Sequence, residues 1–225
     1  IQGTVKGYSN IFTGDGNDIV KVKQGGLVED SFIRTQGGND QIDIENGGKL
    51  KASTITVGEG AVVTVQGTLD KSTIDAGNST GSLEVKILNG ADINVESYSY
   101  GVSKIIGGKN NDTVTMEGGT IAKGDIKLGK GDDIVKIAGG EIKDNSAIDG
   151  GEGKDTITIS ENAKMIGGKL NTGAGLDDKI LVKDGGKLHD TEIILGANGQ
   201  NGGQSTDRAL FEVTGSSELK EVQIN

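Results

Sequence analysis

The chain has 225 residues and a formal net charge of −10, which disfavours nucleic acid and anionic membranes as partners. Forty residues are glycine, and the absence of cysteine excludes a disulfide framework and thiolate chemistry. No apolar run approaches the roughly 18 residues that span a bilayer, so we expect no membrane insertion by this segment.

An apolar pair with one residue between its members recurs along the whole chain, each time after a polar, glycine-rich corner. Two further apolar residues follow each pair, the first usually after a Gly-Gly step, and then the cycle restarts. The pairs are Val20/Val22, Ile42/Ile44, Val63/Val65, Val85/Ile87, Val114/Met116, Val135/Ile137, Ile157/Ile159, Ile180/Val182 and Phe211/Val213.

This repeat predicts the fold. Alternation within each pair indicates a short strand with one buried face. Three such strands per cycle predict an all-β, right-handed parallel β-helix, or β-solenoid, of about nine coils of roughly 20 to 24 residues. The whole of 1–225 is expected to form a single solenoid domain, as a fragment of a longer chain, with insertions at 94–104 and 196–206.

One aspartate recurs just before the first strand of most coils, and the repeat predicts that these side chains stack along one corner. Stacked carboxylates and backbone carbonyls are the oxygen ligands that Ca²⁺ prefers. The alternative is that each aspartate only caps its own turn through backbone amides. The candidate calcium ligands are Asp18, Asp40, Asp112, Asp133, Asp155 and Asp178.

Two of the three tyrosines, Tyr98 and Tyr100, lie within the first insertion. Tyrosine contributes a large contact area at a small entropic cost, so this Tyr-Ser-Tyr segment is a candidate contact site for a glycan or a protein. The alternative is that both rings fold back over an apolar edge.

Two sets of motifs resemble known families. The half-repeats VKQGGLVEDSFI and IENGGKLKASTI resemble repeats in passenger domains of self-associating autotransporter adhesins. The corners TGDGNDIV, LGKGDDIV, GGEGKDTI and GGKNNDTV resemble the calcium-binding nonapeptide GGxGxDxUx of RTX proteins, although here the motif occupies one corner of a longer coil.

The adhesin resemblance implies export, with display on the outer membrane of a Gram-negative bacterium or secretion. It also implies a structural and adhesive role, with a host surface protein, a glycan or a second copy of the chain as partner. The RTX resemblance implies the alternative of a calcium-binding secreted module.

A polysaccharide-active enzyme is the second alternative, because β-helices also host such enzymes. The pairs Asp132/Asp133 and Asp177/Asp178 could supply the two carboxyls that glycoside hydrolysis needs. The segments Gly-His-Gly and Arg-x-Lys, which accompany such carboxylates in pectin-type hydrolases, are absent, and the single histidine is His189. We therefore expect no enzymatic activity.

Overall fold

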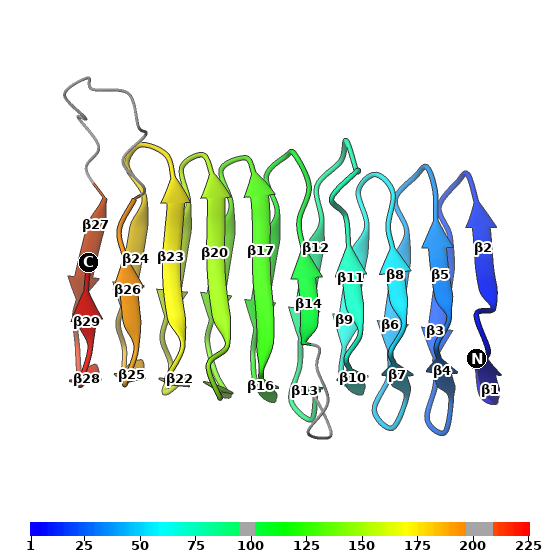
Figure 1. Cartoon of the computed structure of the whole chain (residues 1–225), viewed down its shortest axis with the longest axis horizontal. Coiled ribbons are helices and arrows are strands. Elements are labelled where there is room, and N and C mark those ends of the chain that lie inside the picture. Colours follow the sequence, from blue (N-terminus) through cyan, green and yellow to red (C-terminus); the bar gives the residue numbers. More distant parts are fainter. Residues whose placement is uncertain (95–101, 197–208) are drawn as a thin grey trace.

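The computed structural model of the chain describes residues 1–94, 102–196 and 209–225. Within these ranges every regular element is a β-strand, and all strand pairs are parallel. The strands form three sheets, and each sheet takes every third strand of the chain, which is the topology of a β-solenoid (Figure 1).

Sheets A and B each contain ten strands, and sheet C contains nine. Sheet A consists of β1 (Thr4–Lys6), β4 (Leu27–Glu29), β7 (Lys49–Lys51), β10 (Thr68–Asp70), β13 (Asp92–Asn94), β16 (Thr120–Ala122), β19 (Glu141–Lys143), β22 (Lys164–Ile166), β25 (Lys187–His189) and β28 (Glu218–Lys220).

Sheet B follows sheet A along each coil. It consists of β2 (Asn10–Gly14), β5 (Phe32–Thr35), β8 (Thr54–Thr56), β11 (Thr73–Asp75), β14 (Ser103–Ile106), β17 (Gly124–Lys130), β20 (Ala147–Glu152), β23 (Lys169–Ala174), β26 (Glu192–Ile194) and β29 (Gln223–Ile224).

Sheet C holds the apolar pairs of the repeat. It consists of β3 (Ile19–Val22), β6 (Gln41–Ile44), β9 (Val62–Val65), β12 (Glu84–Ile87), β15 (Thr113–Met116), β18 (Ile134–Ile137), β21 (Thr156–Ile159), β24 (Lys179–Val182) and β27 (Leu210–Val213). The fold prediction is therefore confirmed as an all-β solenoid of stacked parallel strands.

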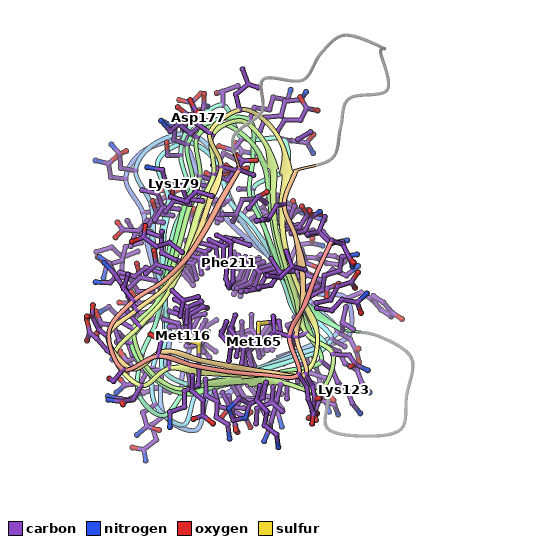
Figure 2. The ribbon with its side chains drawn as sticks, turned by 90° about the vertical axis from the view of Figure 1, so that its left-hand side faces the viewer. Met116, Lys123, Met165, Asp177, Lys179 and Phe211 are labelled. Carbon is purple, nitrogen blue, oxygen red and sulfur yellow. The ribbon has the colours of Figure 1, made fainter. Side chains whose placement is uncertain are left out.

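The core is a set of apolar columns that run along the stack. The register places each inward side chain on its equivalent in the next coil, as in the pairing Val135↔Ile157↔Ile180. These side chains are almost fully buried in the middle of the stack. At its two ends they are less so, because Val5 and Ile11 are partly buried and Val213, Leu219 and Ile224 are 40%, 39% and 52% exposed. Viewed along the stack, Met116, Met165 and Phe211 point into the triangular interior (Figure 2).

The two predicted insertions, 94–104 and 196–206, lie largely outside the described residues. The described chain is interrupted once between β13 and β14 and once between β26 and β27. Within the residues that the structure describes, no helix is long and apolar enough to cross a membrane.

Candidate functional site: the aspartate corner

The six predicted aspartates all lie at the corner that leads from sheet B into sheet C, each directly before a sheet C strand. We call this set, with its equivalents in the other coils, the aspartate column. Their stacking is confirmed, because the strands that they precede are paired in register. Ala61, Leu83 and Ala209 occupy the same position before β9, β12 and β27, which explains the gaps in the row.

The carboxyl groups of the column are turned toward the interior. Asp18, in the first coil, is half-buried. The other five aspartates are each at most 2% exposed: Asp40, Asp112, Asp133, Asp155 and Asp178. The apolar residues Ala61 and Leu83 are equally buried at their equivalent positions. The column is thus part of the core lining and does not line the solvent-facing side of the corner.

In five of the six aspartates, all but Asp18, the carboxylate replaces a backbone acceptor. Its Oδ1 atom accepts the backbone N–H of the equivalent residue one coil nearer the N-terminus, so these side chains extend the hydrogen-bond ladder of sheet C by one residue. The N···Oδ1 distances are 3.0 Å for Asp18 to Asp40, 2.6 Å for Leu83 to Asp112, 2.7 Å for Asp112 to Asp133, 2.8 Å for Asp133 to Asp155 and 2.8 Å for Asp155 to Asp178.

A second, outer row of side chains bonds in the opposite direction. Asn17 Oδ1 accepts the N–H of Asn39 at 2.9 Å, one coil nearer the C-terminus. Asn111 Oδ1 likewise accepts from Asp132, at 2.8 Å, and Asp132 Oδ1 accepts from Lys154, at 2.9 Å. These bonds join neighbouring corners, so through Oδ1 the side chains bond backbone amides of the adjacent coil rather than those of their own turn.

The second carboxyl oxygen distinguishes members of the column from one another. Asp112 Oδ2 accepts the N–H of Gly108 at 2.6 Å. In contrast, the Oδ2 atoms of Asp18, Asp40, Asp133 and Asp155 are buried without a hydrogen-bond partner. A buried polar atom without a partner costs free energy unless a proton or a ligand satisfies it, so these oxygens are where the corner can bind a proton or a cation.

The pKa values reflect this environment. Burial raises the pKa of Asp133 to about 7 and that of Asp155 to about 6, and it also raises the pKa of Asp112. Backbone hydrogen bonds to the ionised form oppose the shift, whereas neighbouring carboxylates add to it. Near neutral pH, Asp133 and Asp155 therefore exchange between the protonated and ionised forms.

A buried, partly ionised carboxyl can hold a proton or a hard cation. Calcium binds six to eight oxygens at about 2.3–2.6 Å. Among the residues that the structure describes, no group of three or more His, Asp or Glu side chains comes together as a metal site would require. A calcium ion at this corner would thus rely on Oδ2 of Asp133 and Asp155 together with backbone carbonyls and water.

The other predicted site residues do not converge. Tyr98 and Tyr100 lie outside the described residues. Asp132 is exposed while Asp133 is buried, so this pair does not present two carboxyls to one substrate; Asp177 and Asp178 differ in the same way (Figure 2). His189 lies partly exposed on sheet A, with Nε2 3.3 Å from Glu218 Oε1.

One cluster was not predicted from the sequence. Phe12, Phe32 and Arg34 meet on the outer face of sheet B, with the Arg34 guanidinium 5.4 Å from the Phe12 ring centre and 4.6 Å from that of Phe32. The signal was present in the repeat, because Phe12 and Arg34 occupy equivalent positions in successive coils. It was missed because the repeat was aligned on its inward positions only.

Comparisons of the chain with protein-family models, with curated proteins and with solved structures find no match.

Proposed function

We propose that this chain is a rigid structural and adhesive segment of a bacterial protein that is secreted or displayed at the cell surface. It would act by contacting a host surface protein or glycan, or a second copy of itself. The observation that carries the proposal is the stack itself: three parallel sheets of ten, ten and nine strands around one uninterrupted apolar core.

The outer faces of the stack carry exposed ion pairs, which can exchange partners when another molecule binds. Ion pairs join adjacent coils, such as Lys51 with Glu29 at 2.6 Å and Lys21 with Asp43 at 3.0 Å. Both lysine side chains are more than 40% exposed, and exposed pairs of this kind contribute little to stability because solvent screens them. These side chains can therefore change partners at little cost when another surface approaches.

The test uses the 225-residue chain in two formats. Sedimentation of the free chain over a wide concentration range measures self-association, and binding of the labelled chain to epithelial cells measures adhesion. We expect at least one of the two to be saturable and to weaken with salt, because charged faces would carry the contact. A chain that stays monomeric at millimolar concentration and binds no cells would refute the proposal.

A calcium-responsive module is the second candidate, and the buried Oδ2 atoms of Asp133 and Asp155 favour it. An ion that binds only the folded chain stabilises it by mass action. Calcium at ten times its dissociation constant or more would then raise the thermal midpoint relative to chelator, and the double variant Asp133→Asn/Asp155→Asn would lose this response. A wild-type midpoint that is identical in millimolar calcium and in chelator would exclude this candidate.

A further inference from the structure

The cluster of Phe12, Phe32 and Arg34 lies at the N-terminal edge of sheet B. Phe12 on β2 is paired in register with Arg34 on β5, and Phe32 is two residues before Arg34 on the same strand. Residues two apart in a strand project to the same face, and the intervening Ile33 is fully buried. All three side chains therefore project outward from the solenoid.

Two aromatic side chains of this region are strongly exposed, whereas Phe32 is half-buried. Phe12 is 58% exposed, and Tyr8, at the corner just before β2, is 78% exposed. The whole chain contains only three phenylalanines and three tyrosines. A concentration of large apolar side chains on one surface region is a mark of binding sites, because leaving such area in water is unfavourable.

Arg34 lacks an anionic partner. In the described ranges no carboxylate lies within ion-pairing distance of its guanidinium, and its one side-chain hydrogen bond runs from Nη1 to Asn10 Oδ1. A guanidinium carries five N–H donors in one plane. Contact with two phenyl rings orients this plane, so the remaining donors are already positioned for an anion.

We propose that Phe12, Phe32 and Arg34 form a binding site for a sugar that carries a single carboxylate, such as a terminal uronic acid of a glycan. The guanidinium donates to the carboxylate, and the exposed Phe12 ring contacts the C–H face of the pyranose. The proposal rests on the adhesive function proposed above and names a partner class for it.

Charge decides between a single acidic sugar and a polyanion. The chain has a net charge of −10, which repels a densely charged chain over the range of the Debye length. One carboxylate next to an unpaired guanidinium is attracted at short range without this penalty. A rigid pyranose also joins its apolar face and its carboxylate in one unit, which matches a ring beside a guanidinium.

The test is titration calorimetry of the whole chain with a tetrasaccharide that ends in glucuronic acid, compared with the same tetrasaccharide ending in glucose. We expect the acidic form to bind at least tenfold more tightly, a ratio that corresponds to about 1.4 kcal/mol. The variants Arg34→Gln and Phe12→Ala should each weaken binding of the acidic form about tenfold or more.

Two control variants match these changes. Lys127→Gln removes an exposed cation from the same outer column of sheet B, and Ile134→Ala truncates a 48% exposed apolar side chain on sheet C. Neither should change the affinity. Thermal melts of all four variants show whether each is folded, so a loss of binding can be assigned to the site.

Three outcomes would overturn the site. They are equal affinity for the acidic and neutral sugars, no binding of either sugar, and loss of self-association in Phe12→Ala, which would make the cluster an interface between two copies. If no sugar binds but the chain still adheres to cells or to itself, the sugar site is wrong and the adhesive function stands. If adhesion and self-association fail as well, both are wrong.

Discussion

At the scale of single residues, the aspartate column combines a hydrogen-bonded carboxyl oxygen with a buried one that has no partner, as at Asp133. Asp133 supplies an acceptor to the buried N–H of Asp112, yet its own second oxygen has no partner. Ala61 and Leu83 show that the same position accepts apolar side chains in other coils. Aspartate is therefore not required for packing at this position, and its contribution depends on hydrogen bonding and on its protonation state.

The raised pKa values predict that the solenoid loses stability as the pH rises. The folded chain holds protons on Asp133 and Asp155 more tightly than an unfolded chain, whose carboxyls have the ordinary pKa of 3.8. The stability from this source is fully present below about pH 4 and is lost as the pH rises through 6 and 7. Urea midpoints at pH 5 and pH 8 measure the loss.

The control is the double variant Asp133→Asn/Asp155→Asn, which keeps an acceptor oxygen at each position but cannot titrate. We expect a smaller difference between its midpoints at pH 5 and pH 8 than in the wild type. The same pH dependence in both proteins would show that these carboxyls do not titrate in this range.

Removal of the acceptor itself has a separate, predictable cost. Asp133→Ala leaves the N–H of Asp112 buried without its partner, whereas Asp133→Asn retains a carbonyl oxygen. At pH 5 we expect the alanine variant to be about 1–3 kcal/mol less stable than the asparagine variant by urea unfolding. Equal stability of the two would mean that the N–H of Asp112 finds another acceptor.

At the scale of elements, the corners restrict the sequence more tightly than the strands do. Gly153 has a φ of +134°, and a Cβ atom there would lie 1.9 Å from the carbonyl oxygen of Gly131 in the preceding coil. Gly16 occupies the equivalent place in the first of these corners, with a φ of +116° and no atom within 4 Å of its Cβ position. A side chain at Gly16 would thus meet backbone strain alone, whereas one at Gly153 would meet the same strain and a steric clash with the neighbouring coil.

Alanine at these two positions should therefore have unequal effects. Gly16→Ala introduces only strain from the left-handed backbone, of about 1–3 kcal/mol. Gly153→Ala adds a clash with backbone that can be relieved only by moving a coil, which should cost about 1–3 kcal/mol more. Denaturant unfolding measures both, and equal losses would show that neighbouring coils separate easily at this corner.

The elements also show what could be predicted from sequence. The inward positions were predictable because branched apolar residues recur with an alternation that only a half-buried strand explains, as at Val135 and Ile137. The inward direction of the aspartates was not, because an aspartate in a polar, glycine-rich corner usually indicates an exposed turn. The contact of Arg34 with Phe12 depends on the register between two coils, which becomes visible only when outward positions are aligned as well.

At the scale of the whole molecule, each coil contacts only its neighbours, so stability is expected to vary along the stack. The terminal strands β28 and β29 each pair with one strand only, and their apolar side chains are partly exposed. Strands β18 and β21 pair on both sides and carry fully buried side chains.

Hydrogen exchange should therefore be slowest in the middle of the stack. We expect amides of β18 and β21 to exchange more slowly than amides of β28 and β29, because opening the terminal coil exposes less apolar area. Peptide-level exchange followed by mass spectrometry measures this gradient. Uniform protection along the chain would indicate that the solenoid opens only as one cooperative unit.

A rigid stack also has a defined length. Ten strands at a spacing of about 4.8 Å span roughly 45 Å. In the described chain, each of the three sheets is continuous from its first strand to its last. A segment of this shape is suited to hold contact groups at fixed intervals, and this is the property that the adhesive proposal uses.

The most direct test of the adhesive role is the rupture force between two surfaces, one coated with the chain and the other with the chain or with epithelial cells. We predict a rupture force above that of a surface coated with an equally acidic globular protein, and a decrease in this force at high salt. A rupture force equal to that of the control on both kinds of surface would contradict the account.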